Sequence, residues 1–488
     1  AERHARAAGE RALAQDAPTA AARLLTMALE AAARAGRPEP AGLRCARGRA
    51  HAALGTFEAA RQDLEACVAE AFAAGDRERE WRTTVELGRL WAARDYARSR
   101  EFFVRALDLA TAWGDPLALA RSLNRLGNWH MNVDEPDAAL AFHERALALL
   151  ADRPHESETR RELAVTHDLM AIAASVLYEE ERALRHFSEA IAVFEELGDH
   201  RSLAACRINR SELRGHWSLY LGSTFCEVDP HGALRECEAA LAETRELDWR
   251  SGEAWALLTL AGGHAFRGEY DLAFARGRLA LEVAEETGNA QWQVLAHVAL
   301  TNASLDLFDA PGALAHAGEA LRMAHELGSP VYVRFAGHYL ARTHLLAGDV
   351  GAAGAVLDEL APSGMLMRTA GQRLLWVARV EHALARDEAA SALAVTLDLI
   401  TRTGPDGHGR PAPYLDLLRG RALARLGRLD EAAAAREQRW RQVELRAALA
   451  MGRLLRRRRR VRESEAWRAG ARGLAAELAA TVPDAAAR

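Results

Sequence analysis

The sequence predicts an all-α protein, a solenoid in which about twelve helix–turn–helix units follow one another along the chain. Two observations support this class. Apolar residues recur at the three- and four-residue steps of a helix face, as Leu119, Leu123 and Leu126 do. A pattern of small residues also returns about every 40 residues, which indicates an internal repeat. One helix pair cannot bury its own apolar face, so each unit needs neighbours.

The clearest unit covers residues 118–149. Its first helix carries Gly127, and the turn that follows contains Pro136, which suits the first turn of a helix but not its interior. Ala139 and Ala146 lie on the second helix. We expect the two antiparallel helices to approach closely at these three small residues, because a larger side chain would hold them apart.

Other stretches keep the same spacing, in which a small residue is followed by another twelve positions later and a third after seven more. The spacing is complete in Gly9, Ala21, Ala28; Gly48, Ala60, Cys67; and Gly452, Ser464, Ala471, and it begins in Gly420, Ala432. Degenerate copies centre near Ala171, Ser211, Gly262, Thr301, Ala341 and Ala378, and Gly88 heads one more.

A second pattern recurs in phase with the first, where a glycine is followed by a short polar residue. It occurs at Gly75-Asp76, Gly114-Asp115, Gly198-Asp199, Gly288-Asn289 and Gly328-Ser329. Glycine adopts the left-handed conformation that ends a helix, and Asp, Asn or Ser caps the next one. These pairs therefore predict where second helices end and the following units begin.

The units divide the chain into two parts. Residues 1–403 hold about ten units, with an insertion near 221–231, and residues 404–413 form a Gly/Pro-rich stretch that predicts a flexible joint. Residues 414–488 hold the last two units and a helix stop at Pro483. Insertions in repeat arrays fall in loops and often on a binding face, but neutral loop drift explains the insertion equally well. The expected units cover residues 1–39, 40–76, 77–115, 116–154, 155–199, 200–248, 249–289, 290–329, 330–361, 362–404, 414–440 and 441–480.

Composition narrows the classes of partner. The 488 residues carry a formal net charge of −5, which argues against general binding to nucleic acid or anionic membranes. Half of the residues are hydrophobic, but no apolar run reaches transmembrane length. All 63 basic residues are arginine, and the five cysteines form no CxxC pair, which favours small buried thiols in a reducing cytoplasm. The chain begins with Ala1 inside a repeat, so we expect a fragment of a longer polypeptide.

The sequence offers no catalytic or metal-binding motif. A phosphate-binding GxxxxGK[ST] loop is absent, as are HExxH and GxSxG, so we expect neither an enzyme nor a cofactor in this chain. The run Arg456–Arg460 is typical of a nucleic-acid or targeting patch, but it falls at the turn between two predicted helices. A solvated turn is the preferred interpretation.

The repeat spacing resembles the tetratricopeptide repeat. This resemblance implies a right-handed superhelix whose first helices line a concave groove, and in the unit of Gly127 the groove positions are Arg121, Asn124, Arg125 and Asn128. The family's peptide-carboxylate clamps use Asn and basic residues at matching positions, where amide and guanidinium groups offer several donors. The position after the glycine is also basic in other units, as in Arg49, Arg89, Arg342, Arg379, Arg421 and Arg453. Asn209, Arg210, His216 and Trp217 form a second, weaker candidate patch beside the insertion. The alternative is that a chain without lysine places arginine at any exposed helix position.

The step of about 40 residues with its Gly-Asp stops, together with the ending ELAATVPD at 477–484, also resembles the sensor arrays of signal-transduction ATPases with numerous domains (STAND) of the MalT-like kind. Such arrays also occur with LuxR-type or adenylate-cyclase output domains. The resemblance implies a cytoplasmic bacterial sensor that binds a peptide, protein or small inducer and acts on an ATPase or output domain N-terminal to it. A stand-alone interaction scaffold and the regulatory tail of a cyclase or kinase remain the alternatives.

Overall fold

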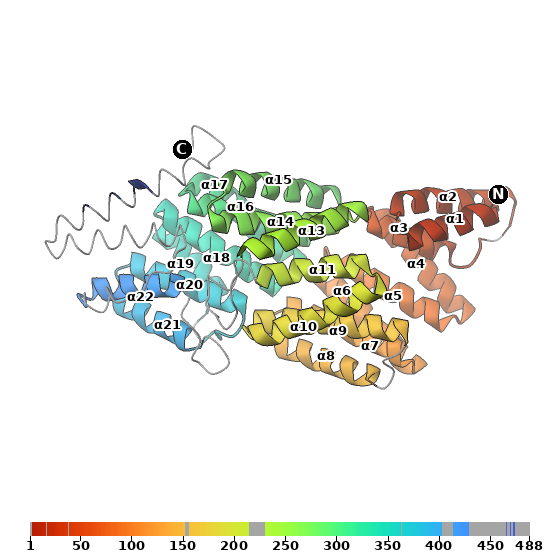
Figure 1. The fold of residues 1–488 in the computed structure, drawn as a ribbon, viewed down its shortest axis with the longest axis horizontal. Coiled ribbons are helices and arrows are strands. Elements are labelled where there is room, and N and C mark those ends of the chain that lie inside the picture. Colours follow the sequence, from red (N-terminus) through yellow and green to blue (C-terminus); the bar gives the residue numbers. More distant parts are fainter. Residues whose placement is uncertain are drawn as a thin grey trace.

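The computed structural model describes residues 2–15, 17–37, 39–151, 156–213, 230–362, 364–402 and 413–428, together with residues 465, 469, 472 and 473. Within these ranges the regular structure is helical, as the sequence predicts (Figure 1). No helix in the described part of the chain is both long and apolar enough to cross a bilayer.

Ten antiparallel helix pairs follow one another in the described residues, and α22 comes after them. The pairs are α1 (Glu2–Ala14) with α2 (Pro18–Arg34), α3 (Leu43–Ala53) with α4 (Phe57–Ala74), α5 (Arg77–Ala92) with α6 (Tyr96–Trp113), α7 (Pro116–Asn132) with α8 (Pro136–Leu150), α9 (Ser157–Val176) with α10 (Glu180–Leu197), α11 (His200–Glu212) with α13 (Pro230–Glu246), α14 (Arg250–Arg267) with α15 (Tyr270–Glu286), α16 (Ala290–Asp306) with α17 (Ala310–Leu327), α18 (Pro330–Ala347) with α19 (Val350–Leu360), α20 (Ala370–Ala385) with α21 (Ala389–Thr401), and then α22 (Pro413–Arg425).

The predicted helix boundaries are confirmed at the polar residues that follow the glycines. Each side chain accepts a hydrogen bond from the backbone N–H three positions ahead, which satisfies one of the unpaired donors at a helix start. The preceding glycines all have positive φ values, between 58° and 77°. The capping residues are Asp76, Asp115, Asp199, Asn289 and Ser329.

Small residues lie where the two helices of a pair meet, also as predicted. Ala139 and Ala146 are fully buried. A Cβ added to Gly127 would lie 2.6 Å from the ring of His143, and one added to Gly88 would lie 2.5 Å from the ring of Phe103. Contacts that short are not tolerated in proteins, so the glycines set the close approach of the helices.

The solenoid curls until its two halves touch: the turn between α5 and α6 lies against the start of α16, and the turn between α7 and α8 lies against the start of α18. The turns inside the early pairs contact the starts of first helices about five pairs later, beyond the contacts between neighbouring units that hold a stacked repeat array together. Arg94 donates to the backbone oxygen of Thr287 at 2.8 Å, and the Ala290 N–H donates to the Ala93 oxygen at 3.0 Å. The Ser329 hydroxyl donates to the Asn132 oxygen at 2.7 Å. First helices are thereby enclosed between the two halves.

Asp134 makes two further contacts across this seam. Its backbone adopts a left-handed conformation with φ of 67°, which a short polar side chain tolerates. The Asp134 carboxylate accepts a hydrogen bond from the side chain of Gln372 at 2.8 Å and pairs with Arg334. Nearby, Arg368 donates to Asp137 at 2.8 Å. The polar turn that interrupts residues 118–149 in the sequence therefore also holds the two halves of the solenoid together.

One expectation about the cysteines is wrong. Cys45 of α3 and Cys67 of α4 are joined by a disulfide, with Cα atoms 5.4 Å apart, because both occupy positions where the helices of one pair face each other. Cys206 and Cys237 are buried free thiols, as expected. Several predicted features lie outside the described residues: Cys226, most of the 221–231 insertion, the joint up to residue 412, the Arg456–Arg460 run, His216, Trp217 and nearly all of residues 429–488.

Candidate functional site

First helices of both halves surround a partly open cavity of about 1710 Å³. Its walls come from α3, α5, α7, α9 and α11 of the first half and from α14, α16 and α18 of the second half. Usual small-molecule sites occupy about 300–1,000 Å³, so this space admits a larger ligand. The concave surface that the tetratricopeptide resemblance implies is therefore present, as a deep cavity between the two halves.

Helix α7 lines one side of the cavity with Arg121, Arg125 and Asn128. These residues are spaced by four and then three positions and so lie on one face of the helix. Arg121 is held by two acids of α9: its Nε donates to Glu162 at 3.1 Å, and its Nη2 donates to Glu158 at 3.0 Å. Arg121 is therefore already neutralised.

Arg125 differs from Arg121 because no residue in the described part of the chain forms a hydrogen bond or ion pair with its guanidinium. Burial, reinforced by the positive charge of Arg89, lowers the pKa of Arg125 to about 10. Glu162 and Glu86 oppose this shift through space. A desolvated cation without a bonded anion is costly, and an anionic ligand would relieve that cost.

Other cavity groups also have unused hydrogen-bonding capacity. The Asn128 side-chain amide and the Arg49 guanidinium form no hydrogen bond with any described residue, and both line the cavity. The buried Asn302 Oδ1 also has no partner among these residues. Arg89 has only a long ion pair, 3.9 Å from Glu86. The cavity thus presents mostly donors on α3, α5 and α7, and an amide acceptor on α16.

The opposite charge gathers on α9 and α11. Burial raises the pKa of Asp168 to about 6, while hydrogen bonds from Cys206 and Asn209 oppose this shift. Burial also raises the pKa of Glu212, which accepts a hydrogen bond from the Thr259 hydroxyl at 2.7 Å. Both carboxyl groups line the cavity. Asn209, a predicted site residue, lines it as well, and donates to Asp168 at 3.3 Å.

Aromatic side chains cover the part of the cavity formed by the second half. Trp255 of α14 and Trp292 of α16 stack with ring centroids 5.1 Å apart and planes inclined by 13°. Trp249 and Tyr332 line the same region. Arg201 lies 4.7 Å above the ring of Trp249. These rings offer flat apolar surface beside the polar walls.

The groove-facing position predicted for Asn124 is wrong. Asn124 is fully buried and does not line the cavity, because it points between α7, α8 and α9. Its Nδ2 donates to Glu162 at 2.7 Å and to the Thr166 hydroxyl at 2.8 Å, and its Oδ1 lies 3.0 Å from Nδ1 of His143. Asn124 thus holds Glu162, which in turn holds Arg121.

The same correction applies to two arginines of the later units. Arg342 is 5% exposed, and its Nε donates to Glu381 at 2.8 Å inside the packing of α18, α20 and α22. Arg379 donates to the backbone oxygens of Leu357 and Ala361, at 2.9 and 2.8 Å, and so satisfies carbonyls at the end of α19. Neither residue lines the cavity: Arg342 is held by side chains of α20 and α22, and Arg379 by the end of α19.

Sequence reasoning missed several cavity residues that its own register points to. The position after the small residue lines the cavity in many units, including those without arginine: Arg49, Arg89, Asn128, Ile172, Glu212 and Asn302. Glu212 follows Ser211 and Asn302 follows Thr301, both of which mark degenerate units. If every residue that follows the small residue of a unit is taken as a cavity position, whatever its type, Glu212 and Asn302 are both predicted.

Comparison with known proteins adds the following. No protein-family model matches the chain, and no curated protein is similar to it. Among solved structures, a Rap protein complexed with competence and sporulation factor is 13% identical with a TM-score of 0.49, covering 87% of this chain and 99% of its own. A STAND protein with a tetratricopeptide repeat sensor from Pyrococcus horikoshii is 13% identical with a TM-score of 0.40; the alignment covers 70% of this chain and 53% of that chain. Yeast Tom70 is 12% identical with a TM-score of 0.38 over 96% of this chain and 95% of its own. Likeness at this level concerns the helical-repeat fold alone.

Proposed function

We propose that this chain is a ligand-binding repeat domain whose interior cavity holds an extended, carboxylate-bearing ligand, such as a short peptide. The observation that carries the proposal is Arg125, a partly buried guanidinium in the cavity wall with no bonded partner in the described residues. A carboxylate would supply the two acceptor oxygens that a guanidinium binds best.

The other cavity groups favour a peptide over a simple anion. Asn128 offers an amide donor and acceptor, and Asn302 offers an unpartnered acceptor, which together match the N–H and C=O groups of an extended backbone. The stacked Trp255 and Trp292 suit an apolar side chain. The cavity volume of about 1710 Å³ also exceeds that of usual small-molecule sites.

The finer assignment rests on the resemblance of the repeats to MalT-like STAND arrays. In that assignment the chain is the sensor region of a cytoplasmic bacterial regulator, and ligand binding acts on an ATPase or output domain. The ligand would need to bind one state of the regulator more tightly than the other in order to shift the balance between them. Because first helices of both halves converge on one cavity, we favour a sensor that takes a ligand there over a scaffold that joins two folded proteins.

The proposal is tested with peptide libraries of known composition. Pentapeptides with free C-terminal carboxylates are incubated with the full chain, and native mass spectrometry identifies the bound masses. The same library with amidated C-termini serves as the matched control. We expect a subset of the free-carboxylate peptides to bind, one peptide per chain. The amidated forms of the same peptides should not bind.

Two variants connect any binding to the cavity. Arg125→Gln removes the unpaired charge and should abolish the preference for free carboxylates. Arg98→Gln, at an exposed arginine whose nearest acid is Glu101 at 3.5 Å, should retain it. Equal capture of free and amidated peptides, or a preference that survives in Arg125→Gln, would contradict the proposal.

A further inference from the structure

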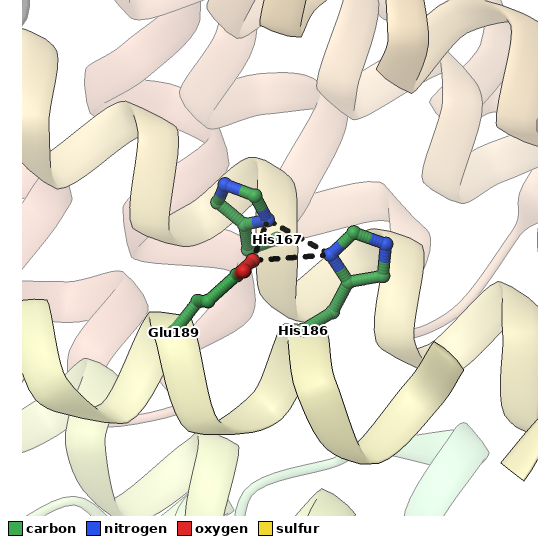
Figure 2. A group of neighbouring side chains, drawn as sticks. All are labelled: His167, His186 and Glu189. Carbon is green, nitrogen blue, oxygen red and sulfur yellow. Dashed lines mark hydrogen bonds and ion pairs between the residues drawn. The ribbon is translucent and has the colours of Figure 1, made fainter. Parts of the chain in front are cut away.

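A second cluster of ligand-type side chains lies outside the cavity, between α9 and α10. His167 comes from α9, and His186 and Glu189 come from α10 (Figure 2). The two Nδ1 atoms are 2.9 Å apart, and Glu189 Oε2 lies 2.9 Å from Nδ1 of His167 and 3.4 Å from Nδ1 of His186. All three side chains therefore point toward one common position.

These separations suit a small divalent ion. Zinc binds imidazole nitrogen at about 2.0–2.1 Å and carboxylate oxygen at about 2.0–2.2 Å, so the ligand atoms of a tetrahedral site lie about 3.3 Å from one another. The observed triangle is close to that size and needs only a slight opening of the two rings. With three protein ligands, the fourth position of the ion would face solvent beside the exposed Glu189.

The electrostatics of the cluster also suit a cation. A neutral imidazole has one nitrogen lone pair, and the Nδ1 atoms of His167 and His186 both face the common position. Glu189 supplies a negative charge. The nearest opposing charge is Arg182, which is paired with Glu179 at 3.0 Å and with Glu144 at 3.5 Å.

The chain contains a second set of the same residues at the same spacing, which serves as an internal comparison. His297 and His316 are 19 residues apart, as His167 and His186 are, and their Nδ1 atoms also lie 2.9 Å apart. Glu319 follows three residues later, as Glu189 does. Glu319 is occupied by Arg322, whose Nε donates to Oε2 at 2.9 Å and whose Nη2 binds Oε1. The second set therefore has two free ligand groups where the first has three.

We propose that His167, His186 and Glu189 bind a divalent transition-metal ion, with zinc the best match to the donor set. Both imidazoles bind through Nδ1 with the proton on Nε2; the ring that donates in the present His–His contact changes tautomer, losing its Nδ1 proton to water and taking one up at Nε2, so these two neutral rings release no net proton. The ion ties α9 to α10 on the side of the pair away from the cavity. Asp168, the next residue on α9, lines the cavity.

The test uses the full chain after treatment with a chelator. Titration with Co²⁺ is followed by the visible absorption of the bound ion, and equilibrium dialysis with Zn²⁺ then gives stoichiometry and affinity. We expect one equivalent of either ion. His186→Ala and Glu189→Gln should each weaken binding at least tenfold, whereas His316→Ala at the comparison set should leave it unchanged.

Glu189→Gln alters an exposed side chain and therefore keeps the fold, which circular dichroism verifies for every variant. Three outcomes would overturn the proposal. The first is that the wild-type chain takes up no saturable equivalent of Zn²⁺ or Co²⁺. The second is that binding persists in both His186→Ala and Glu189→Gln. The third is that His316→Ala loses as much affinity as His186→Ala, which would show that a His–His pair alone accounts for the uptake.

Discussion

Arg94, in the turn between α5 and α6, donates a hydrogen bond to the backbone oxygen of Thr287 at 2.8 Å, across 193 residues of sequence. Its guanidinium also lies 4.3 Å from the ring centre of Phe57. Burial lowers the pKa of Arg94 to about 10, yet this side chain is satisfied by the opposite half of the solenoid. The contact is one of several that bring the two halves together around the partly open cavity.

Removing this contact should loosen the seam. Hydrogen bonds from charged groups contribute about 1.5–3 kcal/mol, so Arg94→Ala should weaken the contact between the halves by roughly that amount. Hydrogen exchange is the direct measurement, because the Ala290 N–H donates to the Ala93 oxygen across the same seam. We expect faster exchange at Ala290 in Arg94→Ala but not in the exposed control Arg98→Ala. Unchanged protection would mean that Arg94 does not hold the seam.

Asn124 and Asn128 of α7 should respond differently to truncation. Asn124→Ala leaves the buried groups of Glu162 and His143 without their partner, and an unsatisfied buried polar group costs about 1–3 kcal/mol. Asn128 forms no side-chain hydrogen bond with described residues, so Asn128→Ala should leave stability nearly unchanged. Urea unfolding of both variants measures the difference. A larger loss in Asn128→Ala would contradict these roles.

Asp168 should make stability depend on pH. Its folded-state pKa of about 6 lies above the reference value of 3.8, so between these values the folded chain keeps a proton that the unfolded chain has lost. Stability should therefore fall as pH rises through this window, and the cost is complete above the folded pKa. Asp168→Asn removes the charge, so its stability relative to wild type should rise between pH 4 and pH 7. The gain could reach about 3 kcal/mol, since one pKa unit is about 1.4 kcal/mol. If the unfolding free energies of the two proteins differ by the same amount at every pH in this range, the prediction is refuted.

Much of the fold follows from local sequence signals. Gly75-Asp76 ends one helix and caps the next through interactions within a few residues, so a single sequence is enough to place them. The small residue Gly127 likewise has a local reason, since it faces the second helix of its own pair. These helix ends, caps and small contact residues recur at the same position of each unit, so they can be identified from the sequence.

The site is only partly predictable because its geometry depends on distant segments. Arg125 and Asn128 follow from position on one helix face. Asn124 does not face the cavity because it binds Glu162 of α9, which lies 38 residues away in the sequence. The enclosure depends on pairings about 200 residues apart, such as Asn132 with Ser329, and no periodic pattern specifies these.

The most direct test of the central claim uses one free-carboxylate peptide that the wild-type chain selects. The dissociation constant of this peptide is measured for the wild-type chain and for Arg125→Gln, and the two constants are compared. Titration is followed by the fluorescence of the tryptophans that line the cavity, at 0.15 M salt. A charge-assisted hydrogen bond of about 1.5–3 kcal/mol predicts an affinity at least tenfold weaker in the variant. Equal affinity in the two proteins, with the peptide still bound, would show that Arg125 is not the carboxylate-binding group and would contradict the account.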